Sequence, residues 1–295
     1  MRLAAYVLLG DPSWLVPSIR SYYDHVDQIV ASYDQDFHSW SGLDMGPEMR
    51  GCIRLLQEND PAGKVTLLPG PFSCPGEHPQ LGETRQRQAS LVAAADFGEW
   101  VVQLDTDEIA HQPERIVVEI KAADRDGCAG LEYPARWIYT HISRNWFLEA
   151  ATRRMSIWSA IPGPVAVRAG TTLRRARQVE VKMRQLRFGS EGGGRVRPIE
   201  AILHFSMVRS SASMRWKADI SSHAPDLDWG ARLALWEEAC AHPTRAVLRS
   251  VIAPRFGSYR PVRLPAMYGN EMVAEQTLLG DPDRLRSSDE QARGA

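Results

Sequence analysis

One stretch, residues 99–108 (EWVVQLDTDE), most limits what this chain can fold into. Its apolar run is typical of a central strand that is covered on both faces. Asp105, Asp107 and Glu108 follow where that strand passes into a loop. Open α/β sheets bind ligands at the carboxyl ends of their strands, and neighbouring carboxylates repel one another unless a cation lies between them. The stretch therefore predicts a metal-assisted site at the end of a buried strand.

The first hundred residues alternate strand and helix patterns at short spacing, which favours a parallel sheet with helices on its faces. We expect strands over residues 3–9, 28–33 and 64–68 and helices over 13–23, 47–57 and 81–95. The remainder is less regular, with helices over 114–123, 231–241 and 244–253 and strand-like runs over 130–139, 166–173, 178–188 and 199–207. The predicted fold class is α/β: an open, mainly parallel sheet flanked by helices, with an elaborated C-terminal half.

Composition excludes several classes of protein. A net charge of -1 gives no electrostatic reason to expect a nucleic-acid partner. The four cysteines are scattered, so neither a disulfide framework nor a structural zinc site is expected. No run approaches the roughly 20 apolar residues of a transmembrane helix, and residues 3–9 fit a first strand better than a signal peptide. We expect a cytoplasmic protein without a transmembrane segment, ending in a disordered polar tail over 281–295.

Three segments of the first half resemble family 2 glycosyltransferases: ETRQRQA at 83–89, AAADFGEW at 93–100 and LDTDE at 104–108. Those enzymes share an arginine-bearing helix, a G-x-W strand and a D-x-D-E end. The resemblance covers residues 1–135 best. It implies one GT-A-like catalytic domain over 1–280, with a nucleotide-binding half over 1–110 and an acceptor-binding half over 111–280. The implied reaction moves a sugar from a UDP- or GDP-linked donor to an unidentified hydroxyl acceptor, with inversion.

The same resemblance implies roles for three acids. Asp107 corresponds to the residue that binds Mn²⁺ or Mg²⁺, and Asp105 to the residue that contacts the ribose or the donor sugar. A hard divalent ion that bridges diphosphate oxygens would stabilise the departing nucleotide. Asp34, at the end of the second expected strand, matches an acid that contacts the nucleotide. Its alternative role is to form a turn in Asp34-Gln35-Asp36.

Two arginines on the helix over 81–95 are candidates for binding the diphosphate. A guanidinium suits phosphate oxygens because it presents several donors in a fixed fork. Arg85 and Arg87 both qualify, and one of them is expected to form a surface ion pair instead. The family often has Arg-Asn here, whereas this chain has Arg87-Gln88.

A second motif lies in the C-terminal half, at residues 202–210 (ILHFSMVRS) and 214–217 (MRWK). It is similar to a stretch of the family 92-like glycosyltransferases, H-[YF]-x-x-[RK]-S followed by F-x-x-K. The resemblance implies that His204 approaches from a late strand and completes the metal site, because imidazole joins carboxylates readily around Mn²⁺. Lys217 would neutralise phosphate as a point charge. The alternatives are a core histidine and a lysine that extends from a helix to solvent.

The sequence offers several candidates for the catalytic base. Inverting transfer needs a carboxylate within hydrogen-bond reach of the acceptor hydroxyl. Glu149, Asp226 and Asp228 are the candidates. Two other readings stay open, a sugar-phosphate nucleotidyltransferase and a non-catalytic module that binds nucleotide sugars. Residues 10–13 (GDPS) make a poor phosphate cradle, which speaks against the first, and the intact acids speak against the second.

Overall fold

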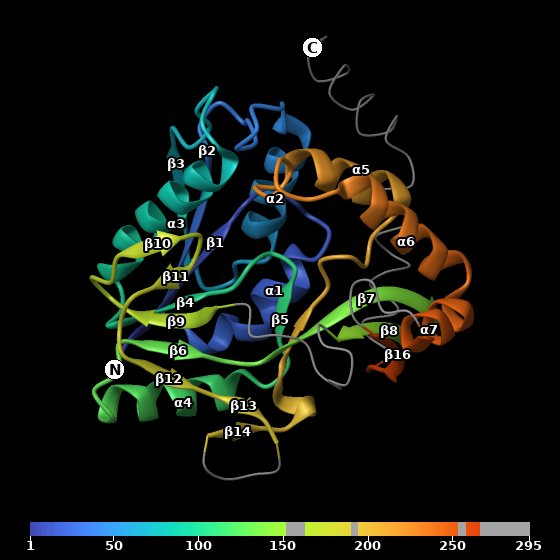
Figure 1. The fold of residues 1–295 in the computed structure, drawn as a ribbon. Helices are drawn as coiled ribbons and strands as arrows, with labels where there is room; N and C mark the ends of the chain where they lie inside the picture. Colours follow the sequence, from blue (N-terminus) through green and yellow to red (C-terminus); the bar gives the residue numbers. More distant parts are fainter. Residues whose placement is uncertain (152–162, 190–193, 253–257, 266–295) are drawn as a thin grey trace.

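The computed structural model describes residues 1–151, 163–189, 194–252 and 258–265. Strands and helices alternate up to α4, and a second group of strands and three helices follows (Figure 1). The helices are α1 (Leu15–Tyr22), α2 (Gly46–Glu58), α3 (Pro79–Ala95), α4 (Pro113–Arg125), α5 (Ser211–Ile220), α6 (Trp229–Ala241) and α7 (Pro243–Ile252), with 3₁₀ turns η1 (Tyr23–His25) and η2 (Pro198–Glu200).

A seven-stranded sheet forms the larger layer, in the order β12-β6-β9-β4-β1-β2-β3. Its neighbours β4, β1, β2 and β3 are all parallel, whereas β9 runs antiparallel to both β4 and β6. This confirms the mainly parallel sheet flanked by helices. The strands are β1 (Leu3–Leu8), β2 (Gln28–Asp34), β3 (Val65–Gly70), β4 (Trp100–Gln103), β6 (Gly130–Glu132), β9 (Pro164–Arg168) and β12 (Met183–Gln185).

Helices cover both faces of this sheet, which is why β1 is apolar at every position. Ala5 and Val7 pack in one cluster with side chains of α1, α2 and α4. Ala4 and Tyr6 point the other way and pack with Leu91 of α3. Successive side chains of a strand alternate between faces, so a strand buried on both sides needs no polar positions.

A five-stranded sheet, in the order β16-β8-β7-β15-β5, forms the second layer. Helices α6 and α7 pack on its outer side, where Trp236 and Ala246 join Tyr139 and Leu148 in one core (Figure 1). The chain passes from β4 of the first sheet to β5 of the second through residues 104–107 alone. The strands are β5 (Glu108–Ala110), β7 (Ala135–Ser143), β8 (Trp146–Ala151), β15 (Ile202–His204) and β16 (Ser258–Arg263).

The prediction of one strand over 178–188 is wrong. The chain there forms three short strands, because each pairs with a different partner: β11 with β10, β12 with β6 and β13 with β14. Helix α5 and strands β5, β8, β14 and β16 were not predicted. The remaining strands are β10 (Leu173–Arg175), β11 (Gln178–Val179), β13 (Arg187–Phe188) and β14 (Arg195–Val196).

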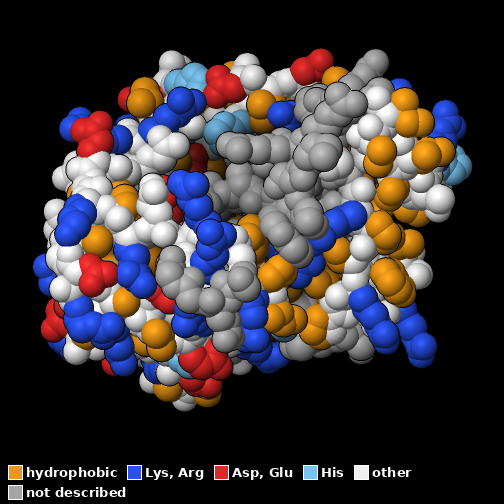
Figure 2. All heavy atoms as spheres, turned by 60° about the horizontal axis from the view of Figure 1, so that its bottom comes forward, with side chains coloured by type: hydrophobic (Ala, Val, Ile, Leu, Met, Phe, Trp, Pro, Cys, Tyr) orange, Lys and Arg blue, Asp and Glu red, His pale blue; other side chains and the backbone are white. Residues whose placement is uncertain are grey.

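The surface carries mixed charge on the face drawn in Figure 2, where Lys and Arg side chains are interspersed with acidic and apolar ones. Apolar side chains gather on the right, the side where α7 lies, and Leu248, Val251 and Ile252 of α7 are exposed. No helix within the described ranges is long and apolar enough to cross a bilayer. The predicted tail over 281–295 lies outside the described residues.

Candidate functional site

The carboxyl ends of β1, β2, β3 and β4 meet at one edge of the large sheet, because these four strands are parallel neighbours. The turn that follows β4 is fixed there by α1, since the Ser18 hydroxyl donates to the carbonyl oxygens of Asp105 and Glu108 at 3.1 and 2.8 Å. Strand β15 joins the same turn from the C-terminal half. His204 lies opposite Glu108 in the ladder, and the Phe205 amide donates to the Asp107 carbonyl at 2.8 Å.

Five charged side chains form what we call the Asp107 cluster: Asp11, Asp107, His204, Arg209 and Lys217. The Asp107 Oδ1 atom lies 3.2 Å from Nε2 of His204. Its Oδ2 atom accepts hydrogen bonds from the Lys217 ammonium at 2.7 Å and from the Arg209 guanidinium at 2.9 Å. Arg209 also forms an ion pair with Asp11, which follows β1. The structure thus brings His204 to Asp107, as the resemblance implies, and places Lys217 on the same carboxylate.

Charge inside the cluster keeps Asp107 ionised. Burial alone would raise the pKa of Asp107, but the charges of Lys217 and His204 and their hydrogen bonds hold it well below its usual range. Burial opposes the charged form of His204 as well, yet the charge of Asp107 raises the pKa of the imidazole. Burial, and then the charge of Arg209, lower the pKa of Lys217. Asp107 is therefore a carboxylate surrounded by cationic groups.

Arg87 occupies the interior, not the surface, and holds Asp105. Its Nε atom donates to Glu83 at 2.9 Å, and its Nη2 atom donates to Oδ1 of Asp105 at 2.7 Å. Burial raises the pKa of Asp105, but the charges of Arg87 and Arg177 outweigh burial and lower it. The Asp105 side chain is 29% exposed, compared with 7% for Asp107. Asp105 is therefore an ionised acid that a ligand can reach.

Two arginines of this region were missed from the sequence. Arg177 donates to the fully buried carboxylate of Glu108 at 2.7 Å and to the Gln103 carbonyl at 3.0 Å. It lies in a stretch rich in basic residues, 174–197, where the sequence alone does not single out one arginine. Arg209 lay within the second motif, one residue after the position where the resembling pattern has Arg or Lys, because this chain has Val208 there, and the Arg209-Ser210 pair was the signal that could have identified it.

The Asp34 carboxylate accepts hydrogen bonds from backbone amides. Its Oδ1 atom accepts from the amides of Asp36 and His38, and its Oδ2 atom accepts from the amides of Phe72 and Ser73 at 2.9 and 2.7 Å. With 3% of its surface exposed, it ties the loop after β2 to the loop after β3. This placement favours the turn-forming alternative over the nucleotide contact.

Replacing Asp34 with alanine is expected to lower the free energy of unfolding by about 2–3 kcal/mol, because buried amides lose a charged acceptor. Urea unfolding followed by circular dichroism measures the change. Asp36→Ala, which removes an exposed neighbouring carboxylate, is the matched control and should leave stability within about 0.5 kcal/mol. Unchanged stability of Asp34→Ala together with weaker nucleotide binding would contradict the structural role.

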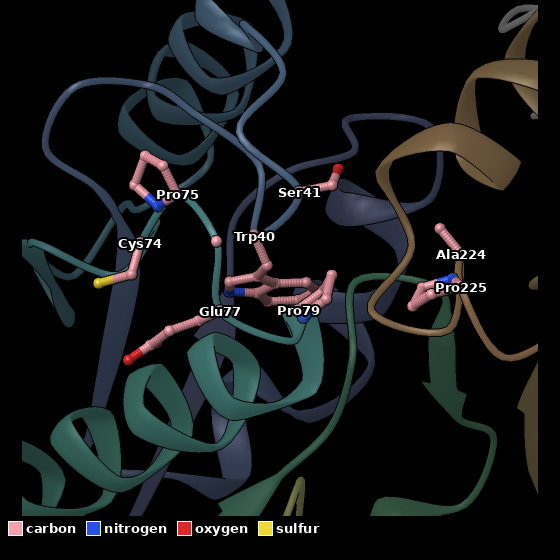
Figure 3. A pocket seen from close by; sticks show the side chains of 9 residues that line it. Trp40, Ser41, Cys74, Pro75, Glu77, Pro79, Ala224 and Pro225 are labelled. Atoms are coloured by element: carbon pink, nitrogen blue, oxygen red, sulfur yellow. The ribbon is translucent and has the colours of Figure 1, made fainter.

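A cavity of about 300 Å³ opens beside these loops, at the carboxyl ends of β2 and β3 (Figure 3). Trp40 and Pro79 lie between the loop that carries Cys74 and Pro75 and the α5–α6 connection. Arg85 of α3 contacts the lining of the cavity through Glu77. Its guanidinium donates to the Glu77 carboxylate at 3.0 Å and to the Phe72 carbonyl at 3.2 Å. The lining residues are Trp40, Ser41, Cys74, Pro75, Gly76, Glu77, Pro79, Ala224 and Pro225.

None of the three predicted bases is part of the Asp107 cluster, and Asp228 caps α6 by accepting from the Ala231 amide at 3.0 Å. Glu149 of β8 is fully buried, and its Oε2 atom accepts from Arg136 and Arg260, both at 2.8 Å. Two ion pairs, with the buried Arg136 and the partly exposed Arg260, therefore balance the charge of Glu149 through Oε2. Asp226 is exposed and pairs with His78 at 3.3 Å, next to the cavity. The geometry favours neither Glu149 nor Asp226 as the group that takes the acceptor proton.

The residues as placed do not fit the Mn²⁺ or Mg²⁺ predicted at Asp107 and His204. These ions require several oxygen ligands at about 2.0–2.6 Å. Both carboxylate oxygens of Asp107 already contact cationic side chains. Across residues 1–151, 163–189, 194–252 and 258–265, no three His, Cys, Asp or Glu side chains are grouped so as to hold a metal ion.

Comparisons with known proteins give no family. No family model matches the chain, and no curated protein matches it. Among solved structures, it is similar to 4-diphosphocytidyl-2C-methyl-D-erythritol synthase from Anaerococcus prevotii DSM 20548, with 12% identity over 57% of this chain and 71% of that one and a TM-score of 0.32. It is also similar to mannose-6-phosphate isomerase from Helicobacter pylori, with 9% identity over 49% and 53% and a TM-score of 0.29.

Proposed function

We propose that this protein is a glycosyltransferase with a GT-A-like arrangement, which moves a sugar from a nucleotide-diphosphate donor to a hydroxyl acceptor. One observation carries the proposal. A partly exposed ionised acid, Asp105, and a partly exposed ammonium, Lys217, lie at the same sheet edge as the cavity beside Trp40. Carboxyl ends of parallel strands are where open α/β sheets bind ligands.

The spacing of the strands suits such a donor. Neighbouring strands lie about 4.8 Å apart, so the ends of β4 and β3, with β1 and β2 between them, are separated by about 14 Å. An extended nucleoside diphosphate can bridge that span. Its base would stack in the cavity against Trp40 and Pro79, and its phosphates would lie toward Lys217.

The reaction needs positive charge near the leaving group and a carboxylate near the acceptor. The acceptor oxygen forms a bond to the anomeric carbon, while the bond from that carbon to the β-phosphate oxygen breaks. The nucleoside diphosphate leaves with the electron pair, and cationic side chains lower the energy of that departing anion. The acceptor proton passes to a carboxylate. Asp105 is the most exposed acid beside the Asp107 cluster, and its Oδ2 atom accepts no hydrogen bond from the described residues.

Isothermal titration with nucleotides tests the proposal. We expect UDP or GDP to bind at least about tenfold more tightly than the matching monophosphate, because the second phosphate adds charge-assisted hydrogen bonds. Trp40→Leu should lower the affinity for the diphosphate and for the monophosphate. Trp146→Leu, at an exposed tryptophan of β8, should lower neither affinity. Slow release of sugar from the bound nucleotide sugar would support transfer. Pyrophosphate formed from a nucleoside triphosphate and a sugar phosphate, without nucleotide-sugar turnover, would instead identify a nucleotidyltransferase.

A further inference from the structure

Both oxygens of the Asp107 carboxylate already have neighbours that can carry positive charge, and Oδ2 has two of them. Lys217 and Arg209 both donate to Oδ2, and His204 contacts Oδ1. A divalent ion on Oδ2 would have to displace Lys217 or Arg209, and one on Oδ1 would lie next to these positive charges. The Arg209 side chain is only 1% exposed, so moving it off Asp107 would leave a buried guanidinium without one of its two acidic partners.

The Lys217 ammonium places a positive charge directly on Oδ2 of Asp107. Its ammonium is held from two sides, by Asp107 Oδ2 at 2.7 Å and by the Ser206 hydroxyl at 2.8 Å. An ammonium has three N–H donors, so these two contacts leave one for another acceptor. The side chain is 23% exposed, which lets a ligand reach that donor.

We propose that Lys217, held by Asp107 and Ser206, takes the place of the divalent cation and binds the diphosphate of the donor directly, so that the protein binds its nucleotide without metal. This inference rests on the proposed function and names the group that recognises the phosphates. Asp107 then acts as a positioning residue: it fixes the ammonium and does not ligate a metal.

The surrounding residues fit this division of roles. Arg209 donates through Nε to the Ser206 carbonyl at 2.7 Å and through Nη2 to Asp107. It therefore fixes both partners of the ammonium at once. A single positive charge attracts a phosphate oxygen less strongly than a divalent ion does, but the electrostatic attraction is larger in a partly buried site than in water.

Metal dependence of binding is the first test. The full-length protein is titrated with UDP and with GDP by calorimetry, once in EDTA and once in saturating Mn²⁺. We expect the dissociation constant of the nucleotide that binds to agree within about threefold between the two conditions. Binding that requires Mn²⁺, or that strengthens tenfold or more with it, would overturn the inference while leaving the proposed function intact. Binding under neither condition would overturn both.

Variants of Lys217 provide the second test. In EDTA, Lys217→Met should weaken the nucleoside diphosphate at least about tenfold and change the affinity of the nucleoside little, since only a charged hydrogen bond to phosphate is lost. Lys182→Met, at an exposed lysine that bonds the Asp126 carbonyl, is the matched control and should bind as the parent does. The role of Lys217 would be overturned if folded Lys217→Met bound the diphosphate as tightly as the parent does. It would also be overturned if the affinities for nucleoside and diphosphate fell by the same factor.

Discussion

Arg177→Met is expected to lower the free energy of unfolding by about 3–5 kcal/mol, because it leaves the carboxylate of Glu108 buried without its cation. Glu108 is completely buried, and the Arg177 side chain is 6% exposed. The guanidinium also donates to the Gln103 carbonyl at the end of β4, so it links the large sheet to the turn that carries Asp105. Urea unfolding monitored by tryptophan fluorescence measures the loss.

The chain offers a matched control in Arg174→Met. Arg174 and Glu180 form a similar ion pair at 2.8 Å, but their side chains are 66% and 73% exposed. Exposed pairs contribute about 0–1 kcal/mol, so this variant should unfold nearly as the parent does. The double variant Arg177→Met/Glu108→Gln should recover part of the lost stability, since the buried charge is gone. Equal effects of Arg177→Met and Arg174→Met would contradict the account of the buried pair.

The first half of the fold was predictable because its signals are local. Strands β1, β2 and β3 and helices α1, α2 and α3 lie within two residues of their expected bounds. Strands β1 and β2 are buried on both faces, the edge strand β3 is a short apolar run, and α1 and α2 each bury an apolar side, so local sequence patterns identify them. Helix α3 begins two residues earlier than expected because His78 caps it and Pro79 occupies its first turn.

The second half was less predictable because strand partners far apart in the chain decide its structure. Residues 178–188 have the composition of one strand, yet they are divided among three ladders. The site shows the same limit. The resemblance predicted that His204 would approach Asp107 and that Lys217 would lie near the phosphates, but it could not show that Lys217 and Arg209 both contact one oxygen of Asp107. Likewise, no local pattern reveals that Asp34 accepts four backbone hydrogen bonds.

Asp107→Ala distinguishes an anchoring carboxylate from a metal ligand by the sign of its effect on stability. If Asp107 only awaited a metal ion among other acids, its removal from metal-free protein would relieve repulsion and leave stability equal or higher. In the structure its neighbours are His204, Arg209 and Lys217. Without the Asp107 carboxylate, the positive charges of these neighbours remain close to one another with no negative charge between them. We therefore expect the free energy of unfolding in EDTA to fall by about 3–5 kcal/mol.

The same variant should also lose affinity for the nucleoside diphosphate, because the Lys217 ammonium is no longer held in place. Asp107→Asn keeps an acceptor oxygen but not the charge, so it should lie between Asp107→Ala and the parent in stability. Asp226→Ala is the control: its exposed pair with His78 should contribute no more than about 1 kcal/mol. If Asp107→Ala in EDTA were as stable as the parent or more stable, the surrounding cations would not need the Asp107 charge to remain in place. The anchoring role of Asp107 would then be wrong.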